Sequence, residues 1–445
     1  MPHSILLLCP DVITERMAGP AIRYWEFAKA LVTEHTVTLA APNPISSSVY
    51  LEKIQLIQHH VDNIAELIEQ HDIIIFQGYI LENYPLLRRC RKILIADLYD
   101  PIPLEGLEQK PDSTHPVTEQ IRVINDQLKY ADYFLCANDR QRDLWLGHLL
   151  SLGRVNITTY AEMQQRVITI PFGLPDTMPQ LETHGFRSQS ALENAFILLW
   201  GGGIWEWFDP LTLIRAVHRL LPRYPQLKLI FLGTQHPNPT IPAMLMQQRA
   251  EHLARELEIA GTAVIFQAGW VNYDQLANYL LDANVGVTAH FESLETHFSF
   301  RTRVLHYLWA GKPIIATKGD VLADAIIQAS AGIVVDYQDE IGWITAIEQL
   351  QNPQQYAIYQ AGVRQLAQKY TWSTVTAPLR NLCHQARLAP DMYIENGCRY
   401  SQVWNCEQAY HQLRHEIYVM EHSHSWKITA PLRNCRRWLS RLKNK

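Results

Sequence analysis

The chain has 445 residues, of which 47% are hydrophobic and 19% charged, so it is long enough for two globular cores. Its formal net charge is −5 and its main body carries no long basic stripe, which argues against a general nucleic-acid-binding protein. The seven cysteines lack metal-ligand spacing and no apolar run reaches the ~18 residues that span a bilayer, so we expect a cytoplasmic protein with reduced thiols and no bound metal.

Short apolar segments rich in β-branched residues alternate with segments of helical period along the whole chain. In the first half these segments are 5–8, 35–41, 72–76, 92–98, 132–137 and 166–172. In the second half they are 196–200, 227–233, 263–269, 285–290, 313–317 and 332–336. Continuous apolar runs of this kind are typical of parallel strands buried on both faces. The sequence therefore predicts an α/β protein with two doubly wound, Rossmann-like domains.

A polar segment at 176–192, which contains Pro, Gly and Ser, separates the two halves. We expect an N-terminal domain over residues 1–180 and a C-terminal domain over 190–375, followed by a crossover helix at 376–388 and a helical tail at 389–445. Ligands of open α/β sheets bind outside the carboxyl ends of the strands. The loops that follow the strands, facing each other across a cleft, are therefore the place to look for a site.

Two loops of the first half carry candidate residues. Gly19 and Pro20 open a helix, and a glycine there allows close approach of the backbone to a ligand, although a simple turn glycine fits equally well. Asp97 and Asp100 follow the strand at 92–98 and could orient a sugar hydroxyl or act as a base. They could equally satisfy loop amides and cap the next turn.

In the second half, three glycines at 201–203 end a strand, and Asp209 is a good N-cap for the next helix. The G-x-G-x-x-G spacing of dinucleotide-binding proteins is absent, which disfavours a nicotinamide enzyme. Trp205, Trp207 and Phe208 lie on the loop between them. These aromatic rings could stack on a sugar or base, or pack between the domains.

The segment around 290–306 combines acidic and basic side chains. Glu292 and Glu295 precede a helix for which Ser299 is a plausible N-cap, leaving first-turn amides available to an anion. Helical spacing places Arg301 on the inward face and Arg303 on a more peripheral one. Arg301 could clamp a phosphate, or it could form an ion pair with Glu292 or Glu295.

Four long motifs carry a resemblance: "MAGPAIRYWEFAKAL", "LCANDRQRDLWLGHLLSLGRVN", "LLWGGGIWEWFDPLTLIRA" and "SFRTRVLHYLWAGKPIIAT". Over about 1–385 the chain resembles the GT-B fold glycosyltransferases of family 4 (glycosyl transferases group 1), in a bacterial branch associated with cell-surface polysaccharide and lipopolysaccharide synthesis. The resemblance implies a nucleotide-diphosphate-sugar donor in the C-terminal domain and an acceptor on the N-terminal domain. It also implies retention of anomeric configuration, with no cofactor and no obligatory metal.

Carried over by position, the resemblance assigns roles to individual residues. Gly19 would approach the donor phosphates or the acceptor, while Gly233, Trp270 and Val271 would line the base and ribose side. The segment 295–303 would hold the diphosphate. The candidate donor-binding residues are Gly19, Gly202, Gly233, Trp270, Val271, Ser299, Arg301, Arg303 and His306, and the candidate catalytic residues are Asp97, Asp100 and Glu295.

The chain departs from the family pattern at two positions. The family has two glutamates eight residues apart, where this chain has Phe298 and His306. We therefore expect Glu295 to serve as a displaced acid, His306 to act as a neutral acceptor for ribose hydroxyls, and Arg301, with Arg303, to neutralise the diphosphate. A sugar-nucleotide epimerase of the same fold and a non-catalytic sugar-binding or scaffold protein remain alternatives.

The last segment, 425–445, has seven basic residues and no acidic one. Leu432, Cys435, Leu439 and Leu442 fall on one helical face, which is typical of a helix that lies on an anionic membrane surface. Such a helix would place the protein on the inner face of the plasma membrane, near a lipid-linked glycan acceptor. A partner-binding or solvated helix is the alternative.

Overall fold

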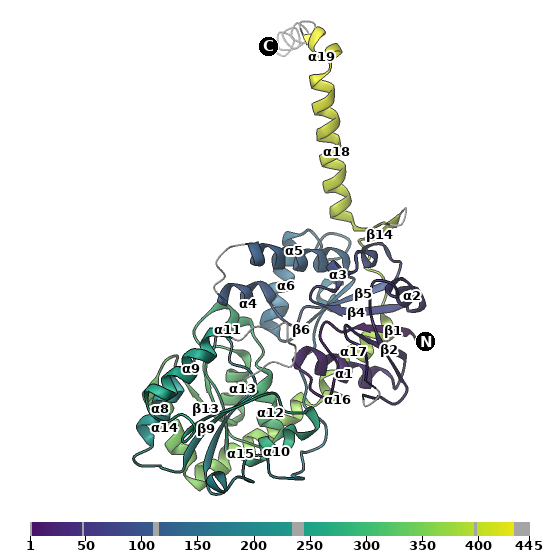
Figure 1. Cartoon of the computed structure of the whole chain (residues 1–445). Helices are drawn as coiled ribbons and strands as arrows, with labels where there is room; N and C mark the ends of the chain where they lie inside the picture. Colours follow the sequence, from purple (N-terminus) through teal and green to yellow (C-terminus); the bar gives the residue numbers. More distant parts are fainter. Residues whose placement is uncertain (1, 47–48, 110–114, 234–243, 396–397, 431–445) are drawn as a thin grey trace.

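The protein consists of two α/β units and a C-terminal extension that ends in a long projecting helix (Figure 1). The computed structural model describes residues 2–46, 49–109, 115–233, 244–395 and 398–430. Both sheets are parallel throughout, and helices cover their faces. The predicted fold class is confirmed.

The first sheet has seven strands in the order β3-β2-β1-β4-β5-β6-β7. Six of the strands coincide with the predicted apolar segments. The seventh, β3, was not predicted because glutamines interrupt its short apolar sequence, IQLIQ, which lies partly exposed at the sheet edge. The strands are β1 (Ser4–Leu8), β2 (Thr36–Ala41), β3 (Ile54–Gln58), β4 (Ile73–Gln77), β5 (Ile93–Asp97), β6 (Tyr133–Cys136) and β7 (Val167–Thr169). The helices are α1 (Gly19–Leu31), α2 (Ile64–Gln70), α3 (Ile80–Asn83), α4 (Ile102–Glu108), α5 (His115–Tyr130), α6 (Asp139–Ser151) and α7 (Met163–Arg166).

The second sheet has six strands in the order β10-β9-β8-β11-β12-β13, and all six coincide with predicted segments. The order reverses beside β8, where doubly wound sheets bind their ligands. The strands are β8 (Phe196–Gly201), β9 (Leu227–Leu232), β10 (Val264–Gln267), β11 (Val285–Thr288), β12 (Ile314–Thr317) and β13 (Gly332–Val335). The helices are α8 (Pro210–Leu220), α9 (Leu245–Glu256), α10 (Leu276–Asp282), α11 (Leu294–Phe298), α12 (Thr302–Trp309), α13 (Val321–Ala329), α14 (Glu340–Leu350) and α15 (Pro353–Ala367).

Direct hydrogen bonds hold the carboxyl ends of the two sheets together. Tyr99, just after β5, donates its hydroxyl to the carbonyl of Phe300 at 3.3 Å. Gln141 of α6 donates to the carbonyl of Phe298 at 2.8 Å, and Arg140 forms an ion pair with Asp324 of α13 at 2.5 Å. The short helix α11 of the second unit also contacts α4 and α6 of the first, so the two sides of the cleft touch directly.

After α15 the chain returns to the first unit through α16 (Trp372–Val375) and α17 (Ala377–Gln385). An antiparallel hairpin, which the sequence did not predict, then packs on the first unit; it consists of β14 (Met392–Glu395) and β15 (Cys398–Ser401). Two buried ion pairs anchor this region, Arg154 with Asp391 at 2.8 Å and Arg399 with Asp132.

The tail continues as α18 (Gln402–His422), which projects from the first unit, and α19 (His424–Ile428) (Figure 1). Within the described chain no helix combines the length and the apolar character needed to cross a membrane. Most of the predicted basic amphipathic segment, from residue 431 onward, lies outside the described residues.

Candidate active site

A cavity of about 590 Å³ lies between the carboxyl ends of the two sheets. Its lining comes from the loops after β1, β4 and β5 on one side and after β8, β9, β10 and β11 on the other. With the exception of Asp97, every candidate residue lines it: Gly19, Asp100, Gly202, Gly233, Trp270, Val271, Glu295, Ser299, Arg301, Arg303 and His306. Residues as far apart in the sequence as Gly19 and His306 thus meet in one place.

The glycine loop after β8 forms part of the floor of this cavity. Gly201 donates its backbone N–H to the hydroxyl of Tyr307 at 2.8 Å, and that hydroxyl donates to the carbonyl of Val287 at 3.0 Å. Tyr307 thus ties the loop to strand β11. Gly202 has φ 107°, a conformation that side chains other than hydrogen rarely allow, so glycine is required there.

Arg303 lies beside this loop and not at the periphery, which corrects the prediction from helical spacing. Its Nη2 donates to the carbonyl of Gly203 at 2.7 Å, and its guanidinium stacks over Phe208 at 4.1 Å and Trp200 at 4.7 Å. The side chain is 7% exposed, yet no described carboxylate pairs with it and Nη1 has no partner. Burial and the neighbouring Arg301 lower its pKa to about 10, so it remains charged at neutral pH.

Arg301, by contrast, is already paired. Its Nη1 and Nη2 donate to the two carboxylate oxygens of Glu295 at 2.8 and 2.6 Å, and both side chains are buried. Asp320 lies 3.9 Å from its Nε. Of the two possibilities left open by the sequence, the structure shows the ion pair, with Glu295 and not Glu292 as partner. The pair forms one wall of the cavity, and Arg303 carries the uncompensated charge.

The helix that carries these arginines begins later than expected. Helix α12 starts at Thr302 with Arg301 at the N-cap position, so Ser299 is not its cap. The Ser299 hydroxyl instead donates to the carbonyl of Thr296 at 3.0 Å, and Ser299 closes the short helix α11. Because α11 ends and α12 begins within four residues, the chain turns sharply here and brings Glu295 and Arg301 together.

His306 lies one turn further along α12, beside Arg303, and it lines the cavity. Burial and the charge of Arg303 lower its pKa to about 4, so the imidazole is neutral at physiological pH. A neutral imidazole offers one nitrogen as an acceptor and one as a donor. Phe298, the other departure from the family pattern, does not line the cavity, whereas Glu295, three residues earlier, does.

On the first unit, Asp97 is not available to a ligand. Arg23 donates Nε to its Oδ2 at 2.7 Å and Nη2 to its Oδ1 at 3.0 Å, and the pair is fully buried. Asp97 therefore holds Arg23 in the cavity wall. Asp100 does face the cavity, where Gln77 donates to it at 2.9 Å. Burial, followed by repulsion from Asp97, raises the pKa of Asp100 to about 7.

Glu105 is a cavity residue that the sequence reasoning missed. It lies one turn into α4, the helix that follows Asp100, and it lines the cavity beside Asp100. Burial and repulsion from Asp100 raise the pKa of the Glu105 carboxyl well above its usual range. Glu105 lies only five residues after Asp100, with Pro101, Pro103 and the start of α4 between them, and this closeness to the end of β5 was the signal in the sequence.

The loops after β9 and β10 line the remaining side. Gly233 has φ 83°, and a Cβ at this position would lie 3.2 Å from the ring of Trp270. Trp205 and Trp207 stack with centroids 5.5 Å apart, and both reach the cavity while packing on the second core. The glycine thus allows an aromatic surface of Trp270 to lie close to the end of β9.

Comparison with known families gives one match, which lies in the second unit. Residues 195–352, which carry the glycine loop, the Arg301–Glu295 pair, Arg303 and His306, match the family model described as Glycosyl transferases group 1. The second unit is therefore similar in sequence to the group 1 glycosyltransferases. No curated protein sequence matches the chain.

Solved structures share the fold over both units of the chain. Sucrose-phosphate synthase from Thermosynechococcus elongatus is 16% identical with a TM-score of 0.61, over 86% of this chain and 98% of that one. Anabaena HepE in complex with UDP and glucose is 14% identical with a TM-score of 0.62, over 86% and 100%. WaaG, a glycosyltransferase involved in lipopolysaccharide biosynthesis, is 13% identical with a TM-score of 0.58, over 85% and 98%. At these identities the likeness establishes the fold.

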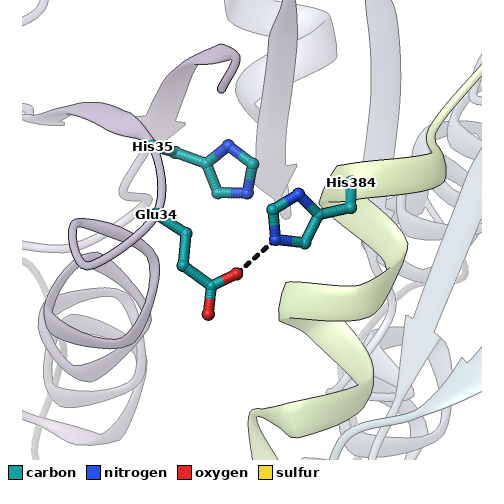
Figure 2. A group of neighbouring side chains, drawn as sticks. All are labelled: Glu34, His35 and His384. Carbon is teal, nitrogen blue, oxygen red and sulfur yellow. Dashed lines mark hydrogen bonds and ion pairs between the residues drawn. The ribbon is translucent and has the colours of Figure 1, made fainter. Parts of the chain in front are cut away.

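Away from the cavity, Glu34, His35 and His384 form a second cluster, where α17 returns to the first unit (Figure 2). His384 contacts the Glu34 carboxylate, and Arg380 lies 3.7 Å from it. His35 Nδ1 accepts the backbone N–H of His3 at 3.1 Å, so in the neutral ring Nε2 carries the proton and cannot bind a metal. Arg380 already supplies a positive charge beside Glu34. The cluster therefore holds α17 against the first unit and does not form a metal site.

Proposed function

We propose that the protein is a glycosyltransferase that moves a sugar from a nucleotide-diphosphate sugar to an acceptor held by the first unit. One observation carries the proposal: Arg303, a buried cation without a carboxylate partner, lies beside the glycine loop of a group 1 glycosyltransferase domain. A buried charge is unfavourable unless it is compensated, and a diphosphate is a suitable partner.

The other residues of the cavity fit the same assignment. The glycine loop allows the diphosphate to approach the backbone near Gly202, and the guanidinium of Arg303 supplies the positive charge that stabilises the leaving group. Neutral His306 offers hydrogen bonds to ribose hydroxyls, while Gly233 and Trp270 leave a surface for the base. We propose that Arg303 supplies the positive charge for the diphosphate and that no metal is obligatory.

In the transfer itself, an acceptor hydroxyl forms a bond to the anomeric carbon as the bond to the diphosphate breaks. Asp100 faces the cavity from the acceptor side, and its pKa of about 7 suits a group that takes up the hydroxyl proton. Glu295, held by Arg301, faces the sugar from the donor side. We propose that the reaction retains the anomeric configuration, as the family resemblance implies.

We further propose a lipid-linked glycan acceptor in surface-polysaccharide synthesis. Support comes from the shared fold with WaaG and from the basic composition of 425–445, which would bring the enzyme to an anionic membrane surface. Removal of 425–445 is expected to lower binding to vesicles that contain anionic lipid and to leave nucleotide binding unchanged. Equal vesicle binding by the truncated protein would contradict the membrane assignment.

The donor assignment is tested by a thermal-shift screen of UDP, GDP and ADP and their sugar conjugates. We expect at least one nucleoside diphosphate to stabilise the protein, because a ligand that binds only the folded state raises its melting temperature. The conjugate that binds is then supplied without an acceptor. Slow hydrolysis to free sugar supports a transferase, interconversion to another nucleotide sugar supports an epimerase, and an intact donor supports a non-catalytic protein.

A further inference from the structure

The two walls of the cavity carry opposite charge. On the donor side the uncompensated group is the cation Arg303, because Arg301 is neutralised by Glu295. On the first unit the uncompensated groups are the carboxyls of Asp100 and Glu105. Of the described basic residues that line the cavity from the first unit, Arg23 alone is present, and Asp97 already neutralises it. The acceptor wall thus offers carboxyl groups and no free cation.

The hydrogen-bonding groups of this wall are mainly acceptor oxygens that lack a donor. Gln77 is 4% exposed, and its Nε2 donates to Asp100 while its Oε1 has no partner. Within the described part of the chain, no hydrogen bond or ion pair reaches the Glu105 carboxyl. Oxygen acceptors without donors attract hydroxyl or amine groups, and a buried acceptor left unpaired costs free energy.

We infer that the acceptor subsite takes an unphosphorylated sugar ring, whose hydroxyls donate to Asp100, Glu105 and Gln77, and that it rejects sugar phosphates. The inference rests on the proposed function, since it assigns the first unit to the acceptor. A phosphate placed on this wall would lie against two carboxyl groups, with no described arginine or lysine free to compensate its charge. Burial is the main cause of the raised pKa of both carboxyls, and repulsion from Asp97 adds to it for Asp100, as repulsion from Asp100 does for Glu105.

Matched pairs of sugars test the inference. The protein is saturated with the nucleoside diphosphate found in the thermal-shift screen. Binding of glucose, mannose, galactose and fructose is then compared with that of their 6-phosphates by saturation-transfer NMR. We expect at least one free sugar to bind about tenfold or more tightly than its phosphate. Equal or tighter binding of the phosphates, or binding of no sugar in any pair, would overturn the inference.

Variants at Asp100 and Glu105 test whether their carboxyl groups, and not the shape of the subsite, cause the rejection of phosphates. Replacing Asp100→Asn and Glu105→Gln together removes both ionisable carboxyl groups at nearly constant volume, and should reduce the discrimination against the phosphates about tenfold or more. Glu108→Gln, on the same helix but outside the cavity lining, is the matched control and should leave discrimination unchanged. Unchanged discrimination in the double variant, with its fold verified by circular dichroism, would overturn the role of these acids.

The nucleotide titration in the same samples keeps this inference apart from the proposed function. If the wild-type protein binds no nucleoside diphosphate, the glycosyltransferase assignment fails. If it binds the nucleotide and prefers phosphorylated sugars, the acceptor inference alone fails.

Discussion

Tyr307→Phe tests how the glycine loop is held in place. The substitution keeps the aromatic ring, which packs against Gly286, and removes only the hydroxyl. That hydroxyl accepts the backbone N–H of Gly201. The pairing of β8 with β11 ends at Leu199, so Gly201 lies beyond it. Since the N–H is buried, its loss of a partner should cost about 1–3 kcal/mol. For a domain of this size, each kcal/mol corresponds to roughly 2–4 °C in melting temperature.

The assay is thermal unfolding with and without saturating nucleoside diphosphate. We expect a lower melting temperature and weaker nucleotide binding, because the loop that should meet the diphosphate loses its anchor. Tyr160→Phe is the control, since Tyr160 is 77% exposed and should tolerate the change. A melting temperature and affinity equal to those of wild type would show that the hydroxyl does not position the loop.

Three further predictions concern ion pairs and protonation. Arg301→Met should destabilise the protein by about 3–5 kcal/mol, because it leaves Glu295 buried and charged; a chemical unfolding midpoint equal to wild type would refute this. The pKa of His306 is lowered in the folded state, so the unfolded state binds a proton more readily and stability should fall as the pH drops from about 6.5 to 4. In unfolding measured as a function of pH, His306→Asn should show a smaller decline. Glu34→Gln should loosen the contact with His384 and speed hydrogen exchange in α17; unchanged exchange would reject the fastening role.

Most strands were predictable because both sheets consist of continuous apolar runs. Strand β3 was not predicted because it lies at the edge of the sheet, where one face needs no apolar side chains. The hairpin β14–β15 was not predicted for another reason. It is anchored by the buried pair Arg399–Asp132, which joins residues 267 positions apart. Periodicity reports local burial and contains no information about such long-range pairs.

The site was predictable in location and less so in the roles of its residues. Loops at strand ends brought eleven of the twelve candidate residues to one cavity. The spacing prediction assumed a helix start at Ser299, whereas α12 begins at Thr302 after a sharp turn; Arg301 is paired with Glu295, and Arg303 lies beside the glycine loop. Whether Asp97 was free or paired depended on Arg23, 74 positions away, and no spacing rule shows that partner.

The central claim is that Arg303 binds the diphosphate of the donor, and isothermal titration of the nucleoside diphosphate into Arg303→Met measures it directly. Methionine fills a similar volume without charge, so the variant should unfold at the wild-type temperature or above, since a buried unpaired charge has been removed. Its affinity for the nucleotide should fall by about tenfold or more, the loss expected for charge-assisted hydrogen bonds. Wild-type affinity in this folded variant would contradict the account.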